Sequence, residues 1–122
     1  MIGNILCACN ELEGKVDNPT LVGFENHGGR TYLGEGVAPL ATVVTGHGNN
    51  GEDGTEGAVY RNVHCSYIHG PLLPKNPHFC DMLLEKALVR KYGEAALEKL
   101  HDDYEWEAHK AMEERLRKNS DG

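Results

Sequence analysis

Glycine spacing constrains this chain more than any other feature, because ten of its fifteen glycines fall between Gly23 and Gly57. Glycine weakens the interior of a strand or helix, whereas tight turns favour it. Short apolar or β-branched runs lie around these glycines, at 1–9, 21–25 and 41–46. This part of the chain is therefore predicted to form short strands joined by close turns.

The extended pattern continues after the glycine-rich part. The runs AVYRNV (58–63) and CSYIH (65–69) are predicted to be strand-like and nearly continuous. Before them, the loop GNNGEDGTEG at 48–57 carries Asn-Gly and Asp-Gly turn signals. Its acidic and amide side chains do not fit the spacing of an EF-hand. The loop is therefore predicted to be a β-turn loop and not a calcium site.

Two helices are predicted after the strands. In the first, Asn76 is expected to cap the helix, Pro77 to take the first helical position and Gly93 to end it. Its apolar residues at helical spacing predict a buried face made of Phe79, Leu83, Leu84, Ala87 and Leu88. The second helix is predicted at 94–118. Its apolar stripe comprises Leu97, Leu100, Tyr104, Ala108, Met112 and Leu116.

An order of strands first and helices last, with no complete β-α-β unit, favours a small α+β fold or the second half of a larger α/β domain. The chain has 122 residues, enough for one domain or part of one. Its net charge of −7 argues against a nucleic-acid partner. No apolar run approaches the roughly 20 residues of a membrane span, and the first residues lack a signal-peptide pattern. A soluble, cytoplasmic protein is expected.

The four cysteines are expected to be reduced thiols, as in other cytoplasmic proteins. Cys7 and Cys9 alternate on a predicted strand and should point to one face. Their spacing, with no second pair, does not favour zinc. No cysteine has glycines two positions before and after it, as an exposed nucleophile on a strand-to-helix turn would. A metal-dependent hydrolase built on His27, His64 and His69 is a remaining alternative.

Two segments carry side chains suited to chemistry. In GFENHGGRT (23–31), paired glycines let a ligand approach the backbone, and Arg30 could hold a carboxylate through two parallel hydrogen bonds. The alternative is a polar hairpin with a surface arginine. In HCSYIHGPLLPKNP (64–77), His69 ends an extended run and is followed by Gly70. It is either a general base on a rigid edge or a turn residue.

Three stretches together strongly resemble a known family: GFENHGGRTYLG, GHGNNGEDGTEGAVYRNV and CSYIHGPLLPKNPHFCDMLLEKALVRKYG. They resemble the glutamine amidotransferase subunits of lipid II isoglutaminyl synthases, which belong to the class I amidotransferases of the cobyric acid synthase type. The resemblance runs from about Leu21 to Gly93. The wider family shares a Tyr/Phe-Glu-x-His segment before Gly-Arg, here Phe24–Arg30, and a Tyr-x-His-Gly segment, here Tyr67–Gly70. The extended HGPLLPKNP and GNNGEDG favour the peptidoglycan branch over the corrinoid branch.

The resemblance implies a reaction in which a cysteine thiolate attacks the side-chain amide of glutamine and ammonia leaves. It also implies a Mur-ligase-like synthetase partner that uses ATP to activate the D-glutamate carboxylate of lipid II, with no cofactor or metal in the amidotransferase itself. By this resemblance His69 is the catalytic histidine, and Arg30, with Gly29 and His27, binds glutamine. Gly70 would leave room for glutamine beside the imidazole.

Two departures from the family pattern qualify these expectations. Pro71 stands where many class I amidotransferases have the glutamate of a catalytic triad. The family's nucleophile lies in an upstream half that this chain lacks. Residues 1–122 are therefore expected to form a single partial domain, the C-terminal portion of an amidotransferase domain, with 94–118 as an extra helix. The isolated chain is expected to be inactive, with self-association through an exposed sheet edge or the C-terminal helix as an option. The alternatives are a non-catalytic binding or regulatory module and a cobyric acid synthase-type fragment.

Overall fold

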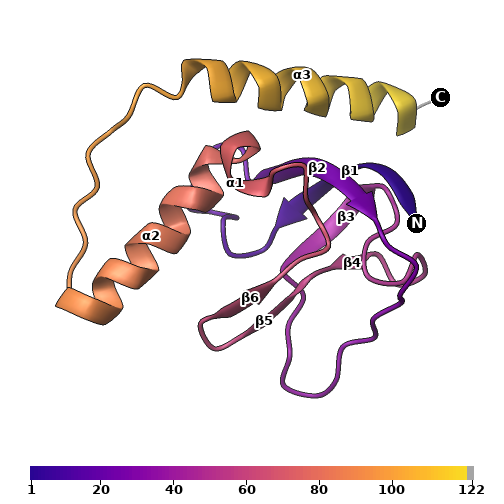
Figure 1. The fold of residues 1–122 in the computed structure, drawn as a ribbon, viewed down its shortest axis with the longest axis horizontal. Helices are drawn as coiled ribbons and strands as arrows, with labels where there is room; N and C mark the ends of the chain where they lie inside the picture. The colour runs from indigo at the N-terminus through magenta and orange to yellow at the C-terminus, as the bar shows by residue number, and fades with distance from the viewer. Residues whose placement is uncertain (121–122) are drawn as a thin grey trace.

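The computed structural model describes residues 1–120, in which strands precede helices along the chain (Figure 1). The strands are β1 (Ile2–Cys9), β2 (Thr20–Asn26), β3 (Ala41–Thr45), β4 (Thr55–Glu56), β5 (Ala58–Tyr60) and β6 (Val63–Cys65). The helices are α1 (Leu72–Lys75), α2 (Pro77–Tyr92) and α3 (Asp103–Ser120). The combination of sheets and helices agrees with the predicted α/β character. None of the described helices is both long enough and apolar enough to span a membrane.

The main sheet is antiparallel and has the order β2-β1-β3-β4. β1 pairs with β2 along most of its length, from Ile2 opposite Asn26 to Ala8 opposite Thr20. The close turns predicted from the glycines do not join these strands, because the connections between them run over residues 10–19, 27–40 and 46–54. The connection at 27–40 also crosses β1, since β2 and β3 lie on opposite sides of it.

A separate hairpin of β5 and β6 replaces the nearly continuous strand predicted at 58–69. The chain reverses at Arg61 and Asn62, and Arg61 takes a left-handed conformation with φ 54°. That prediction is wrong because the local sequence contains no glycine or proline to mark the turn. After β6 the chain leaves the hairpin and reaches β2, where His69 pairs with Phe24.

Both faces of the main sheet are covered, as the alternation of side chains along a strand requires. On one face a core forms from Ile5, Cys7, Cys9, Leu12, Leu21, Leu40, Ala41, Ile68, Phe79 and Met82. Cys7 and Cys9 share this face, which confirms their prediction. On the other face Leu6 and Val22 pack against Leu116 of α3, which lies across the sheet in Figure 1.

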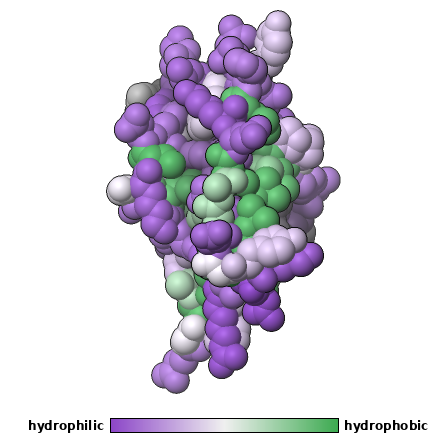
Figure 2. All heavy atoms as spheres, turned by 90° about the vertical axis from the view of Figure 1, so that its left-hand side faces the viewer, coloured by the Kyte–Doolittle hydropathy of each residue, from purple (hydrophilic) through white to green (hydrophobic). Residues whose placement is uncertain are grey.

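The ends of α2 agree with the prediction, because the helix begins at Pro77 and ends before Gly93, which adopts a left-handed φ of 79°. The predicted buried face is wrong beyond the first turns. The buried residues are Pro77, His78, Phe79 and Met82. The second half of α2 extends past the sheet, so Leu84 and Val89 are half-exposed. Figure 2 shows apolar surface gathered on the side of the molecule where α2 lies.

The last helix starts later than predicted, at Asp103 and not at residue 94. Residues 94–102 form no regular structure and are mostly exposed. Tyr104, placed in the predicted apolar stripe, is 84% exposed. The predicted stripe is confirmed at Leu116, which is buried, and at Met112, which packs against the same cluster. It is wrong nearer the start of α3, where buried His109 and not Tyr104 or Ala108 meets the sheet, because a histidine with both ring nitrogens hydrogen-bonded counts as polar in the sequence pattern.

Candidate active site

His69 lies at the outer edge of β2, where its backbone is fixed by two hydrogen bonds. The His69 N–H donates to the Phe24 carbonyl and the Phe24 N–H donates to the His69 carbonyl, both at 2.9 Å. The His69 side chain is exposed and meets the Phe24 ring edge-on, with centroids 5.8 Å apart. Within residues 1–120 its ring forms no hydrogen bond or ion pair. The backbone of His69 is therefore fixed, while its imidazole ring is exposed to solvent.

Gly70, directly after His69, is required by the backbone. Its φ of 93° lies in the region that side chains rarely adopt. A Cβ at this position would lie 3.5 Å from the Phe24 Cβ, an ordinary contact distance. The glycine is thus explained by the turn that follows the edge pairing. The predicted room for glutamine beside the imidazole stays a prediction.

The outer edge of β2 is occupied by the segment that follows His69. The Asn76 side chain, fully buried, accepts from the Val22 N–H at 2.8 Å and donates to the Val22 carbonyl at 2.9 Å. His78 Nε2 donates to the Thr20 carbonyl at 2.9 Å. Asn76 occupies the N-cap position of α2 but makes no capping hydrogen bond with its side chain, because that side chain is used on β2. This edge of the sheet is not open to another copy.

The buried carboxylate of Glu56 fixes the residues that precede His69 in the sequence. Glu56 accepts from the Ser66 hydroxyl at 2.9 Å and from the Tyr67 N–H at 2.8 Å. The Ser66 hydroxyl oxygen in turn accepts from the Ile68 N–H at 2.9 Å. Burial raises the pKa of Glu56, against the opposing effect of these two hydrogen bonds. Residues 66–69 are therefore fixed through their backbone by Glu56 and β2 together.

His27 supports the loop that precedes Arg30. Its ring stacks on Tyr67 with centroids 3.8 Å apart and an interplanar angle of 6°. Its Nδ1 donates to the Gly29 carbonyl at 2.9 Å, and its side chain is only 8% exposed. The structure thus brings His27 and Gly29 onto the segment that carries His69. Their contact with glutamine stays a prediction.

Arg30 already binds a carboxylate of its own chain. Its guanidinium donates to Glu52 at 2.8 Å, and the Tyr32 hydroxyl donates to the other Glu52 oxygen at 2.9 Å. All three side chains lie at the surface. Glu52 contacts only one nitrogen of the guanidinium, so a ligand carboxylate can use the remaining N–H donors of Arg30 or displace Glu52, which exposure and solvent screening make inexpensive.

Glu25 is a second buried carboxylate beneath the loops. It accepts from the backbone N–H groups of His47 and Gly48 and from His47 Nδ1, at 2.7–3.0 Å. The His27 Nε2 lies 3.7 Å from it, beyond hydrogen-bonding distance, and has no hydrogen-bond partner among the described residues. Glu25 thus ties the end of β2 to the start of the 46–57 loop.

The cysteines do not provide His69 with a partner. Cys7 and Cys9 are buried, and burial raises the pKa of both thiols, with Glu56 and Glu25 raising that of Cys7 further. Cys65 is exposed and Cys80 is half-buried. In residues 1–120 no hydrogen bond joins the His69 ring to any thiol.

The loop at 48–57 is closed by its own side chains. Asn49 exchanges hydrogen bonds with the backbone of Gly57, and Asn50 accepts from the N–H groups of Glu52 and Asp53. Over the described part of the chain, no group of three His, Cys, Asp or Glu side chains is arranged to hold a metal ion. The histidines of the metal alternative make separate contacts, since His64 bonds to Glu11 while His27 stacks on Tyr67.

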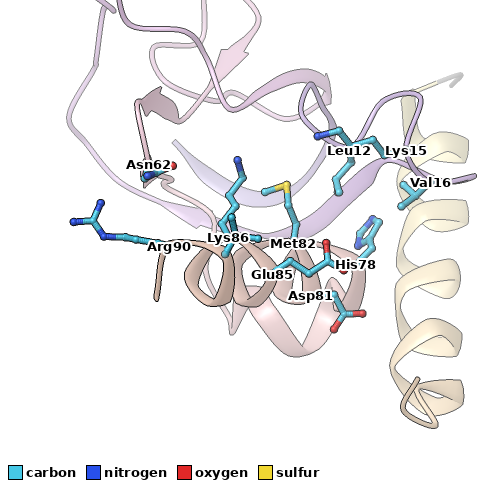
Figure 3. Close-up of a pocket in the computed structure, with 11 residues that line it drawn as sticks. Leu12, Lys15, Val16, Asn62, His78, Asp81, Met82, Glu85, Lys86 and Arg90 are labelled. Atoms are coloured by element: carbon cyan, nitrogen blue, oxygen red, sulfur yellow. The ribbon is translucent and has the colours of Figure 1, made fainter. Parts of the chain in front are cut away.

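A groove of about 730 Å³ lies along α2 and the loop after β1 (Figure 3). Its lining includes Leu12 and Met82, with Lys86 and Arg90 at one end. The predicted site residues His69, Arg30, Gly29 and His27 are not among the residues that line it. The groove is therefore separate from the candidate active site.

Comparison with known proteins identifies the segment that contains this site. Residues 3–77 match the CobB/CobQ-like glutamine amidotransferase domain. The chain belongs to this family. It is 57% identical over 72 residues to the lipid II isoglutaminyl synthase (glutamine-hydrolyzing) subunit GatD of Staphylococcus aureus, covering 59% of this chain and 29% of that protein. It is 49% identical over 75 residues to the GatD subunit of Streptococcus pneumoniae, covering 62% and 29%.

A probable cobyric acid synthase of Methanothermobacter thermautotrophicus is 47% identical over 51 residues, covering 42% of this chain and 10% of that protein. These matches confirm the resemblance inferred from the sequence. The match spans less than a third of the length of each of these relatives. All four predicted site residues lie in the family segment, whereas α3 lies outside it.

Sequence reasoning missed three residues that build the site: Glu25, Glu56 and Asn76. Asn76 was predicted as a helix cap, a local role, and the two glutamates lie in stretches that read as polar loop or strand end. A weak signal exists for the glutamates, since each lies within a few residues of several glycines. Their partners lie 10–54 residues away, which no local pattern reveals.

Proposed function

We propose that this chain carries the histidine-bearing part of a glutamine amidotransferase site, with His69 as the catalytic base. The observation that carries the proposal is the His69 imidazole, which is exposed and unpaired yet anchored by two backbone hydrogen bonds to Phe24. A general base needs this combination of a fixed position and a free ring nitrogen. Family membership of residues 3–77 supports the same conclusion.

In the proposed reaction His69 removes the proton from a cysteine thiol supplied by a segment outside this chain. The thiolate attacks the side-chain carbonyl carbon of glutamine, and the carbon–nitrogen bond breaks as the imidazolium returns the proton to the departing ammonia. Water then hydrolyses the glutamyl thioester to glutamate. Arg30 binds the glutamine α-carboxylate in place of Glu52, through the same guanidinium that now holds that side chain.

The ammonia passes to a Mur-ligase-like synthetase that amidates the D-glutamate of lipid II. The basis for this partner is the likeness to two GatD subunits of lipid II isoglutaminyl synthases. We also propose a cytoplasmic location. We further propose that the chain corresponds to the C-terminal portion of an amidotransferase domain. On that basis the isolated chain does not hydrolyse glutamine.

The test measures ammonia released from glutamine by the chain alone and by the chain mixed with a polypeptide that carries the nucleophile segment of the Staphylococcus aureus relative. Ammonia is expected only from the mixture, and His69→Ala should abolish it. The matched control is His101→Ala, because His101 is exposed and makes no hydrogen bond or ion pair among the described residues. Release from the chain alone that His69→Ala stops would refute the need for an external nucleophile. Release from the mixture that His69→Ala leaves unchanged would refute the role of His69.

A non-catalytic binding module is the second candidate, favoured by the burial of Cys7 and Cys9 and the absence of any thiol bonded to His69 in residues 1–120. This candidate retains Arg30 for binding and leaves His69 without a proton to move. Calorimetric titration of the chain with glutamine distinguishes the two. Binding that Arg30→Ala weakens, with no ammonia from any mixture, would favour the module.

A further inference from the structure

The outer edge of β2 makes hydrogen bonds with a later segment of the chain at three alternate residues. An edge strand presents outward-facing backbone groups at alternate residues, and these need partners. Along β2 these residues are Thr20, Val22 and Phe24. The Thr20 carbonyl accepts from the His78 ring, while both backbone groups of Val22 bond to the Asn76 side chain and both of Phe24 bond to the His69 backbone. A single segment of the chain, 69–78, therefore takes the place of a neighbouring strand.

Asn76 reproduces the backbone of such a strand with its side chain. A residue in a hydrogen-bonded antiparallel pair exchanges one N–H and one carbonyl with its partner. The Asn76 carboxamide does the same with Val22, accepting at 2.8 Å and donating at 2.9 Å. Its second amide hydrogen donates to the Leu72 carbonyl at 2.7 Å, which closes the turn containing α1. The side chain is fully buried, so no water competes for these bonds.

The geometry assigns Asn76 as a positioning residue that holds His69 in its working place on β2. The segment from His69 to Asn76 leaves β2 at Phe24 and returns at Val22, so its two attachment points are two residues apart on one strand. Without the Asn76 bonds, the segment after His69 is attached to β2 only at its two ends, by the Phe24 bridge and the His78 ring, while Glu56 holds the residues before His69. This assignment rests on the proposed catalytic role of His69.

The His69 segment also lies very close to the backbone of β2 between its two attachment points. Gly23, between the two attachment points, faces the segment so closely that a Cβ there would lie 3.1 Å from the His69 carbonyl oxygen. On the other side Glu56 holds Ser66 and Tyr67. Glu56 thus fixes the residues that precede His69, and Asn76 fixes the segment that follows it.

The first experiment uses the full chain and measures amide hydrogen exchange by NMR in wild type and Asn76→Asp. Aspartate keeps the shape and can still accept from Val22, but it cannot donate to the Val22 or Leu72 carbonyls. Loss of two buried hydrogen bonds is expected to reduce protection of the His69 and Phe24 amides by roughly tenfold or more. Protection of Val43, whose N–H donates to the Gly54 carbonyl at 2.8 Å, should fall much less. Asn62→Asp is the charge-matched control, because Asn62 is exposed in the β5–β6 turn.

Equal loss of protection at His69 and Val43 would overturn the assignment, since it would mean that Asn76 stabilises the whole fold and not the His69 segment. Unchanged protection at His69 would overturn it as well. If Asn76→Asp does not fold, as judged by circular dichroism, Asn76→Ser keeps one hydroxyl donor and allows the same comparison.

The second readout is glutamine hydrolysis by the mixture described above. Asn76→Asp is expected to lower kcat at least tenfold while KM for glutamine changes less than threefold, because the displaced group moves a proton and does not bind substrate. A rise in KM with unchanged kcat would overturn the assignment. If His69→Ala leaves hydrolysis unchanged, the proposed function fails, and hydrogen exchange at His69 still decides whether Asn76 holds the segment.

Discussion

Replacing Gly23 with alanine tests how closely the His69 segment must approach β2. Gly23 is buried on β2, and its φ lies outside the left-handed region, so alanine meets no backbone strain there. The added Cβ would lie 2.2 Å from the Ile68 Cγ2 atom and 3.1 Å from the His69 carbonyl oxygen. Ile68 is 5% exposed and β-branched, so its methyl group cannot rotate away freely. The segment must therefore move.

Overpacking of this kind costs about 1–3 kcal/mol. Exchanging glycine for alanine in a strand returns roughly 0.5–1 kcal/mol, because the unfolded chain loses freedom. Subtracting the second range from the first leaves roughly 0–2.5 kcal/mol. Because the added Cβ overlaps the buried Ile68 side chain, the expected net loss in the free energy of unfolding lies in the upper part, about 1–2.5 kcal/mol. The smaller figure applies if the shift is shared between Ile68 and the backbone of His69.

Urea denaturation followed by fluorescence of Trp106, the single tryptophan, measures the loss. The matched control is Gly34→Ala, because Gly34 is exposed and has open space around its missing Cβ. The control should lie within about 0.5 kcal/mol of wild type. Equal stability of Gly23→Ala and wild type would refute the close approach of the segment to β2, and with it the placement of His69.

Three further outcomes are expected. Gly70→Ala should lower the free energy of unfolding by about 1–2 kcal/mol in urea denaturation, because φ is 93° there; an unchanged value would contradict that turn. Burial, with His109 adding to it, lowers the pKa of His78 below its ordinary 6.5, so the unfolded chain binds the proton first as pH falls. Stability measured between pH 8 and 5 should thus decline below about 6.5, and less so in His78→Gln. In a thiol assay with Ellman's reagent, Cys65 should react in the native protein, and Cys7 and Cys9 only after unfolding, since both are buried; fast reaction of all three would contradict the core.

Much of the fold could be predicted because its signals are local. Apolar alternation and nearby glycines placed β1, β2 and β3 to within about two residues of their observed bounds. Pro77 and Gly93 fixed both ends of α2 through their own backbone preferences. The face shared by Cys7 and Cys9 was also readable from the chain, whereas the strand predicted to run up to His69 ends at Cys65.

The candidate site depends on contacts that no local pattern contains. Asn76 was predicted to cap a helix, and only the folded chain brings its carboxamide to Val22, 54 residues earlier in the sequence. The start of α3 and the burial of His109 were missed for the same reason, since the sheet surface that α3 covers is assembled from β1 and β2, whereas Met112 and Leu116 of the predicted stripe do pack there.

Local sequence was enough to place β1, β2, β3 and both ends of α2, because backbone preferences and side-chain periodicity act over a few residues. His69 was singled out by the family resemblance and not by these patterns. The tertiary structure alone decided which polar side chains are buried and what they bind. An unpaired polar group in the core is costly, so Glu25, Glu56 and Asn76 each needed partners that only the assembled sheet and loops supply.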